Sequence, residues 1–438
     1  MFTPGRYIVV DDLIEDLKPL VDALNQIGAP CLGIHYDVAR PLEPKFFAGV
    51  RILFFDLHLM PGQGTTAHAR YGHIVQILEK CINPVGGPYI MVLWTSHVEE
   101  RDNFAAYVER ALEDANLRPL TVLGLDKNKY RDVNGGFAGH ALRADIEQTI
   151  ASHVQLQALL SWEADVLAAA GATLATLGDL VPKSERSLEK YPQALDGILS
   201  RLAVAAAGQQ NVTKDIRGAV NSALAPVLLD RILNQQVNKN ASDLWARAVT
   251  QTQLDQRSRM DPQLAGRMNR MLHLAMPPPE GIKPTAWGAV VKLSEAEAGD
   301  EAMRRRFGLG KAEVLKEFRL KDTDAASCTP FLLRIGAVCD YAQSRIGPIP
   351  YVLGFIVPTS LKRSGKAPEA EFERSNPFFE LPDQKEPVQL VINARFQVSL
   401  VREEVEGWEV LFRIREQFLT MVVAHISAYV TRPGILSL

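Results

Sequence analysis

Residues 7–12 read YIVVDD, and this stretch opens a regular alternation of short apolar runs with amphipathic segments. Four more apolar runs follow at residues 29–34, 50–56, 89–94 and 120–125, with the sequences APCLGI, VRILFFD, YIMVLW and LTVLGL. Segments with helical spacing separate them, such as LIEDLKPLVDALNQI at residues 13–27. Apolar strands separated by amphipathic helices are typical of a parallel sheet covered on both faces. We therefore expect residues 1–150 to form a doubly wound domain with five parallel strands and about five helices.

Polar side chains follow four of these strands at the point where each strand ends. In an open α/β sheet, ligands bind in the crevice outside the carboxyl ends of the strands, so these side chains are the candidates for chemistry. They are acidic, hydroxylic or basic: Asp11 and Asp12, Asp56, Thr95 and Ser96, and Asp126 and Lys127. We expect all four strand ends to converge on one site.

This set of residue types predicts a magnesium-dependent phosphoryl site. Carboxylates gathered in one crevice repel one another, and a hard divalent cation with oxygen ligands offsets that repulsion. Asp56 would then attack a phosphoryl group as a carboxylate nucleophile and form an aspartyl phosphate. Lys127 and the metal would supply positive charge to the transferring group, and Thr95 or Ser96 would donate a hydroxyl to one of its oxygens.

The segments IVVDD, ILFFD, MVLWTSH and LDKNK, which begin at residues 8, 52, 91 and 125, together resemble the receiver domain of two-component response regulators. The resemblance covers about the first 150 residues and implies a flavodoxin-like fold. Any one motif alone is more typical of a helix cap or a turn than of such a site, so the order of all four carries the interpretation. The resemblance implies a role for each residue: phosphoacceptor Asp56; magnesium ligands Asp11, Asp12, Asp56 and the backbone carbonyl of His58; hydroxyl residue Thr95; basic residue Lys127.

The sequence departs from the receiver pattern at three places. Gly124 stands three positions before the lysine, where receivers carry an aromatic residue that follows the state of the hydroxyl, so aromatic switching is in doubt. Asn128 follows the lysine in place of the usual proline, which puts the loop geometry in doubt. The Met-Pro pair after the acceptor is displaced by one residue in DLHLMPG, at residues 56–62. These departures indicate a divergent receiver, one that could hold phosphate without the usual output surface.

The rest of the chain predicts two further domains. Residues 151–285 carry apolar residues at three and four spacing, which favours a helical module that ends in the proline-rich linker MPPPEGIKP, residues 276–284. Residues 286–438 contain four short β-branched or aromatic runs that favour a small barrel or curled sheet: FLLRIGAVCDYA, YVLGFIVPTSL, VQLVINARFQVSL and WEVLFRI. The polar stretch at residues 362–387 is expected to be a long exposed loop, and residues 415–433 a closing helix.

Composition excludes several function classes. The net charge of -3 provides no basic field for nucleic acid. The four cysteines show no CxxC pairing, which argues against a disulfide framework or a zinc site. No signal peptide and no apolar run of about 18 residues is evident, so we expect a cytoplasmic protein that does not enter a membrane. The signatures GxxxxGK[ST], GxGxxG, HExxH and GxSxG do not occur.

Near the C-terminus, Cys339, Asp340 and Gln343 form a compact polar cluster after an apolar strand, which could be an active-site corner or a satisfied turn. The divergent receiver, this CDYAQ strand and the RPGI end together resemble the receiver proteins of bacterial anti-phage conflict systems. The resemblance is strongest to the non-effector receiver component of the defence system called Detocs. It implies a phosphate buffer that draws phosphoryl groups from a sensor kinase, so that noise does not activate a toxic effector.

Three functions therefore stay open on the sequence. The first is a non-enzymatic receiver in a two-component phosphorelay of antiviral defence. It would accept a phosphoryl group on Asp56 from a sensor histidine kinase and then store or relay it. A second receiver or effector protein would be a further partner. The second is a receiver-gated effector whose C-terminal domain degrades a nucleotide or nucleic acid, supported by the polar cluster and by Lys362, Arg363 and Lys366. The third is a phosphate-blind scaffold, in which the acidic pocket serves only as an interaction surface.

Overall fold

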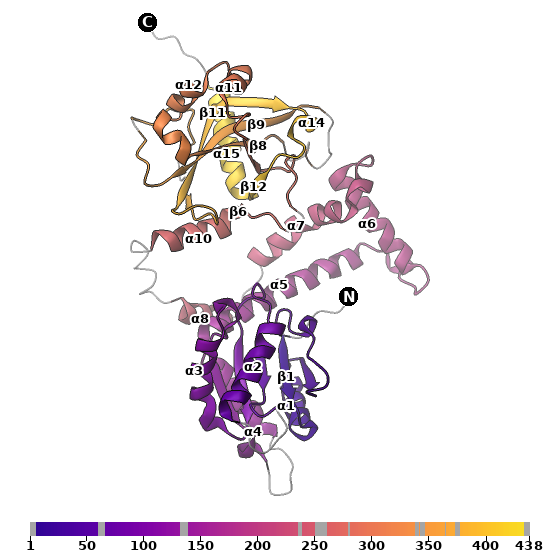
Figure 1. Cartoon of the computed structure of the whole chain (residues 1–438). Helices are drawn as coiled ribbons and strands as arrows, with labels where there is room; N and C mark the ends of the chain where they lie inside the picture. The colour runs from indigo at the N-terminus through magenta and orange to yellow at the C-terminus, as the bar shows by residue number, and fades with distance from the viewer. Residues whose placement is uncertain are drawn as a thin grey trace. The chain divides into compact units, whose positions relative to one another are not determined.

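The computed structural model describes residues 6–59, 66–131, 139–234, 239–249, 261–278, 281–337, 341, 347–363, 365–372 and 377–432. The chain divides into two compact units (Figure 1). The N-terminal unit comprises Met1–Asp165 with Val237–Val249, and the C-terminal unit comprises Val166–Gln236 with Thr250–Leu438. The division into three domains at residues 150 and 285 stays a prediction.

The N-terminal unit contains the predicted parallel sheet of five strands, in the order β2-β1-β3-β4-β5. Every pair in it is parallel, and the five predicted apolar runs supply the five strands. Because the strand order reverses direction at β1 and β3, a crevice for ligands opens at the carboxyl ends of these two strands. The strands are β1 (Tyr7–Asp11), β2 (Cys31–His35), β3 (Ile52–Phe55), β4 (Ile90–Thr95) and β5 (Val122–Asp126).

Helices cover both faces of this sheet, as the continuous burial of β3 and β4 requires. One face packs on α1 (Ile14–Gln26) and α4 (Gly139–Ala151) through a cluster that includes Trp94. The other face packs on α2 (Ala67–Cys81) and α3 (Arg101–Ala111) through a cluster that includes Phe104. Short 3-10 helices complete the connections: η1 (Pro44–Phe46), η2 (Val98–Glu100), η3 (Ala115–Leu117) and η4 (Lys127–Tyr130).

The described residues of the predicted helical module, residues 151–285, are mainly helical. The helices are α5 (Val154–Asp179), α6 (Tyr191–Ala207), α7 (Ile216–Asn234), α8 (Lys239–Ala248) and α10 (Pro262–His273), with the 3-10 turns η5 (Lys183–Glu185) and η6 (Val212–Lys214). By length and composition alone α5 could cross a membrane, although core helices of soluble proteins pass the same test. Its Glu163 accepts hydrogen bonds from both Arg51 Nη2, at 3.1 Å, and Arg51 Nε. This ion pair anchors the first part of α5 to the N-terminal unit.

The C-terminal unit contains a curled antiparallel sheet of seven strands, in the order β10-β11-β9-β8-β7-β12-β6. A register shift between Ile392 and Gln397 interrupts the pairing of β11 with β9, and such bulges bend a strand. The strands are β6 (Leu274–Ala275), β7 (Ala289–Lys292), β8 (Thr329–Arg334), β9 (Ile349–Pro358), β10 (Phe378–Phe379), β11 (Val388–Leu400) and β12 (Val410–Ile414). The sequence predicted β8, β9, β11 and β12; it missed the other three, which have two to four residues each.

Helices also cover the two faces of this curled sheet. The predicted closing helix α15 (Glu416–Val430) packs Phe418, Leu419 and Val422 against one face. The other face carries α11 (Asp300–Phe307) and α12 (Lys311–Glu317), through a cluster that contains Met303 and Phe318. The remaining short elements are η8 (Asp322–Ser327) and α14 (Arg402–Val405).

The prediction that residues 362–387 form an exposed loop is wrong for part of this stretch. Glu371, Phe372 and Phe379 are all buried. The Glu371 carboxylate accepts hydrogen bonds from Arg319 Nη2 at 2.7 Å and Arg319 Nε at 3.2 Å, and it is also paired with Arg363. A buried carboxylate is stable only where its charge is compensated, and the two guanidinium groups provide that compensation here.

We predict that Glu371→Gln lowers the free energy of unfolding of the C-terminal unit by about 3–5 kcal/mol, because it leaves two largely buried guanidinium groups without their carboxylate. Hydrogen exchange of the buried β9 and β11 amides measures the change. Glu369→Gln is the matched control, since that side chain is 77% exposed and should change stability by less than about 0.5 kcal/mol. Equal effects of the two substitutions would refute a structural role for the buried pair.

Candidate functional site

The carboxyl ends of four strands in the N-terminal unit meet at a buried polar site. Asp11 is the last residue of β1, and Asp56 directly follows β3. Thr95 is the last residue of β4, and Lys127 opens η4 directly after β5. These four polar residues are at most 5% exposed although the sheet around them is apolar. Burial of this kind requires specific partners for each charge.

Three carboxylates of this site are arranged as ligands for a cation. Asp11, Asp12 and Asp56 each offer a carboxylate oxygen, and these atoms all lie within 4.8 Å of one another. In the part of the chain that the structure describes, no other group of three acidic, cysteine or histidine side chains meets that condition. A pure oxygen donor set of this size suits Mg²⁺, which takes one or two carboxylates, keeps water and leaves positions for phosphoryl oxygens. The three residues therefore fit the predicted metal.

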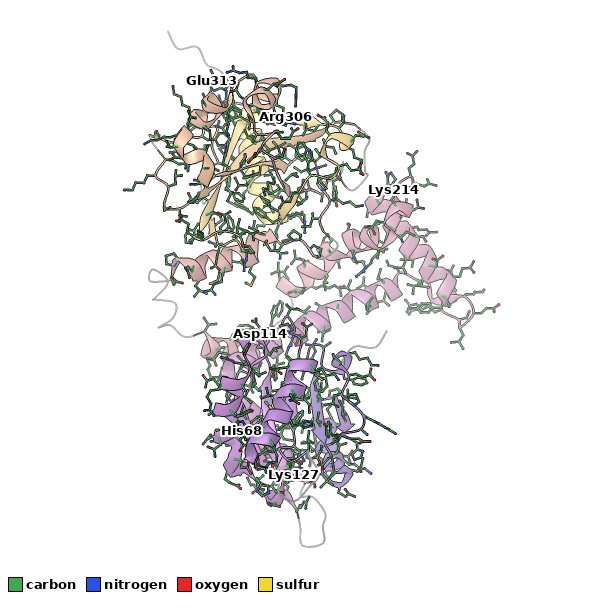
Figure 2. The ribbon with its side chains drawn as sticks, viewed as in Figure 1. His68, Asp114, Lys127, Lys214, Arg306 and Glu313 are labelled. Atoms are coloured by element: carbon green, nitrogen blue, oxygen red, sulfur yellow. The ribbon has the colours of Figure 1, made fainter. Side chains whose placement is uncertain are left out.

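Lys127 is the cation that holds the carboxylates together. Its Nζ donates to Asp11 Oδ2 at 2.7 Å, and it lies 3.3 Å from Asp56 Oδ2 and 3.1 Å from Asp16 Oδ2. The side chain is 3% exposed, so water screens these contacts little. Figure 2 labels Lys127 on the N-terminal unit. Lys127 and Asp56, which follow two of the strands whose ends were expected to converge, are therefore in contact.

Asp16 is a member of the site that sequence reasoning missed. It lies in the first turn of α1, is 2% exposed, and is also paired with Arg131 just beyond η4. The signal that could have found it is its position on the helix. Asp16 lies four residues before Leu20 and eight before Leu24, on the buried stripe of an amphipathic helix where an apolar residue is expected.

The site carries more negative than positive charge, and its pKa values respond to that excess. Burial raises the pKa of Asp11 to about 7, with a further upward contribution from Asp56 and a downward one from Lys127. Burial also raises the pKa of Asp12, again with a contribution from Asp56. Burial alone would lower the pKa of Lys127, but the Asp56 and Asp11 carboxylates more than offset it and raise that pKa. Lys127 is therefore an ammonium group, and a further cation would stabilise the ionised carboxylates.

The two hydroxyl candidates differ in their surroundings. Thr95 is fully buried, and its Oγ1 accepts a hydrogen bond from the backbone N–H of His97 at 3.2 Å, which leaves the hydroxyl proton available to donate. Ser96 is only half-buried, and its Oγ donates to Asn128 Oδ1 at 3.4 Å. The geometry therefore favours Thr95 as the donor to a phosphoryl oxygen.

Asn128 has a local structural reason to replace proline. Its backbone N–H donates to the Asp126 carboxylate at 2.9 Å, and this bond caps η4. Proline has no N–H and could not make that bond. The loop that carries Lys127 is thus fixed by a side-chain cap.

His58 lies two residues after Asp56, and its side chain is partly exposed at the edge of the site. Its ring is 4.5 Å from the ring of His97, and its Nε2 is 3.8 Å from Glu100, a carboxylate that Arg70 and Tyr71 also bind. The role of its backbone carbonyl as a metal ligand stays a prediction. These contacts tie the segment after β3 to η2 and α2.

Gly124 occupies the place where an aromatic residue was expected, and the structure leaves no room for one. A Cβ at this position would lie 2.5 Å from Val98 Cγ2, so η2 packs directly on the backbone of β5. The side chain of Val98 fills the space that a larger residue at position 124 would need. The close approach of Val98 adds to the doubt about aromatic switching that the glycine itself raises.

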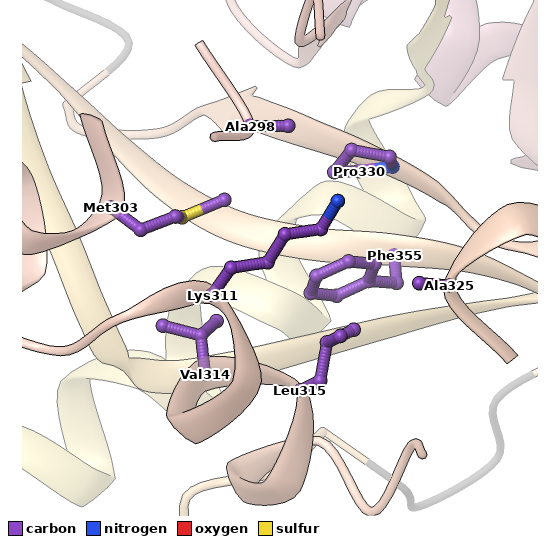
Figure 3. Close-up of a pocket in the computed structure, with 8 residues that line it drawn as sticks. All are labelled: Ala298, Met303, Lys311, Val314, Leu315, Ala325, Pro330 and Phe355. Atoms are coloured by element: carbon purple, nitrogen blue, oxygen red, sulfur yellow. The ribbon is translucent and has the colours of Figure 1, made fainter. Parts of the chain in front are cut away.

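Elsewhere, the C-terminal unit has a small cavity beside α12, shown in Figure 3, but it does not suit a substrate. Its volume is about 40 Å³, far below the several hundred Å³ of typical ligand pockets. Apart from Lys311, its lining is apolar: Ala298, Met303, Val314, Leu315, Ala325, Pro330 and Phe355. Of the predicted C-terminal polar cluster, Cys339, Asp340 and Gln343 lie outside the described residues.

Comparison with known proteins adds no family assignment. No protein-family model matches the chain, and no curated protein matches its sequence. The functional interpretation therefore rests on the geometry of the site.

We predict that the metal-free N-terminal unit becomes less stable as the pH rises from about 5 to 8. The pKa of Asp11 is about 7 in the folded chain against 3.8 unfolded, so its contribution to stability is complete below about pH 4 and is lost as the pH rises through 7. The loss should be on the order of 2–3 kcal/mol. Hydrogen exchange of β1 and β3 amides in a chelator measures it, and Asp11→Asn should remove most of the slope. A slope that Asp11→Asn leaves intact would assign the effect to another group.

We further predict that Gly124→Ala destabilises the N-terminal unit by about 1–3 kcal/mol, because the new methyl group overlaps Val98. Gly139→Ala is the control, since a Cβ there meets no atom within 4 Å and alanine favours a helix. Urea unfolding, monitored by hydrogen exchange of the β4 and β5 amides, measures the free energy of unfolding of the two variants. If Gly124→Ala is as stable as Gly139→Ala, the contact between η2 and β5 is not a tight one.

Proposed function

We propose that the N-terminal unit is a receiver-type domain with a flavodoxin-like fold, in which Asp56 accepts a phosphoryl group. The observation that carries the proposal is the position of Lys127 Nζ, 2.7 Å from Asp11 and 3.3 Å from Asp56, beside a carboxylate triad. Structural ion pairs usually balance their charges, whereas this site has an excess of carboxylates. The excess supports a site that binds a cation and an anionic group together.

The chemistry that this site supports is transfer of a phosphoryl group to a carboxylate. An Asp56 oxygen forms the new P–O bond, and the bond from phosphorus to the leaving group breaks. With acetyl phosphate as donor, acetate leaves with the electron pair of that bond, and no proton need move. Lys127 contacts the phosphoryl oxygens from one side, and the Thr95 hydroxyl donates to them. A bound Mg²⁺ would neutralise the charge of the carboxylates and of the phosphoryl group.

Asp11 and Asp12 hold the metal together with Asp56 in this proposal, and the backbone carbonyl of His58 completes the protein ligands. The burial of Asp11 and Asp56 shields their carboxylates from bulk water, which strengthens each electrostatic contact. The phosphoryl donor is a sensor histidine kinase, and the protein acts in the cytoplasm. The domain is an acceptor, not an enzyme that turns over an external substrate.

Storage of phosphate fits this domain better than switching. If phosphorylation changed the surface formed by β4 and β5, a residue on that surface would have to move. Val98 is in close contact with Gly124 there. We therefore propose that the chain buffers phosphoryl groups in bacterial anti-phage defence and so restrains a second receiver or effector protein. Relay of a state to the C-terminal unit is the alternative outcome. Gene neighbourhood separates the two, because a buffer requires a sensor kinase and a receiver-effector nearby.

The test is incubation of the full chain with acetyl phosphate and Mg²⁺, followed by intact mass. We expect one phosphoryl adduct on the wild type, none on Asp56→Asn, and an unchanged adduct on the control Asp102→Asn, whose carboxylate is exposed. Omission of Mg²⁺ should also remove the adduct. Calorimetric Mg²⁺ binding without any adduct would favour a phosphate-blind scaffold, and an adduct that survives Asp56→Asn would place the acceptor elsewhere.

A further inference from the structure

Asp16 is a buried carboxylate of the site that the metal triad does not include. Its Oδ2 lies 3.1 Å from Lys127 Nζ, and its Oδ1 accepts a hydrogen bond from Arg131 Nη2. Trp94 Nε1 donates to the backbone carbonyl of Asp16 at 3.2 Å, which fixes the helical turn that carries it. Asp16 therefore binds a cation at each end of η4, from a turn of α1 that is itself anchored.

Lys127 has three carboxylate partners, but two of them are also ligands of the proposed metal ion. Asp11 and Asp56 belong to the metal triad, so their oxygens turn toward a cation when one is bound. Each then attracts Lys127 less, and the added positive charge repels the ammonium group. Asp16 is the partner that stays available to Lys127 in both states, since it lies outside the triad.

We propose that Asp16 is the positioning residue of Lys127, which keeps the ammonium group beside Asp56 when Asp11 and Asp56 engage a cation and a phosphoryl group. The inference rests on the proposed function. Without Asp16, Lys127 has Asp11 and Asp56 as its carboxylate partners, so it competes with the cation for their oxygens. Loss of Asp16 should therefore impair both metal binding and phosphoryl transfer, and it should do so through Lys127.

The first measurement is the rate of adduct formation from acetyl phosphate and Mg²⁺. Asp16→Asn is expected to lower the saturating rate roughly tenfold, because a misplaced Lys127 contributes less to the transfer step. The half-saturating donor concentration should change little. Glu15→Gln is the matched control, since it removes the same charge from an exposed position in the same helical turn. Equal rates for wild type and Asp16→Asn would overturn the inference.

The second measurement is a double-mutant cycle on Mg²⁺ affinity, determined by calorimetry. Asp16→Asn should weaken Mg²⁺ binding several-fold more in the Lys127 protein than in a Lys127→Met background, because the competing ammonium group is absent there. Equal losses in the two backgrounds would show a general effect of charge or folding and would refute the positioning role. This readout needs no phosphoryl transfer.

Arg131→Gln keeps the inference testable if Asp16→Asn does not fold, since the Arg131 side chain is 43% exposed. It releases the second oxygen of Asp16 and should produce a smaller loss of rate in the same direction. A wild-type rate for Arg131→Gln would then overturn the inference.

If the wild type forms no adduct, the proposed function fails. If the wild type forms the adduct but the Asp16 and Arg131 substitutions have no effect, only the present inference fails.

Discussion

The N-terminal unit depends on one buried ammonium group. Lys127 lies within 3.3 Å of carboxylates that come from β1, from α1 and from the residue after β3, so it joins three separate segments at the end of β5. Buried carboxylates without a cation would repel one another and protonate. Burial raises the pKa of Asp11 to about 7 even with Lys127 beside it. The crevice holds more carboxylates than cations, and a metal ion would offset that difference.

In the C-terminal unit, by contrast, a buried carboxylate has more cationic partners than its own charge requires. Glu371 is paired with Arg319 and Arg363, so two cations surround one anion. These ion pairs fasten the stretch before β10 to the rest of the unit, and they leave no excess of carboxylates there. Both units therefore bury acids, but only the N-terminal one leaves them short of cations. This contrast supports a binding site in the first unit and a structural role for the pair in the second.

The sequence predicted the parts of the structure that strong local patterns specify. Continuous apolar runs located all five parallel strands, and the carboxyl-end rule then placed Asp11, Asp56 and Lys127 together, because parallel strands share one edge. It missed β6, β7 and β10 because strands of two to four residues are too short to show a period. It also missed Asp16, whose partner Lys127 is 111 positions away in the chain; that pairing follows only from the packing of α1 on the sheet and from the reach of Lys127 from the end of β5.

The departures from the receiver pattern have a common physical consequence. Gly124 lets η2 approach β5 so closely that Val98 occupies the space of a mobile aromatic ring, and the side-chain cap from Asp126 fixes the loop at Asn128. At both positions, a residue that could move in the receiver pattern is replaced by one that is held by packing or by a hydrogen bond. A rigid rim favours a stable phosphoryl site, since the groups that contact the phosphoryl oxygens need no rearrangement. It also weakens transmission, because coupling between sites requires an element with two arrangements. Under the proposed function, we therefore expect this domain to hold a phosphoryl group rather than to report it.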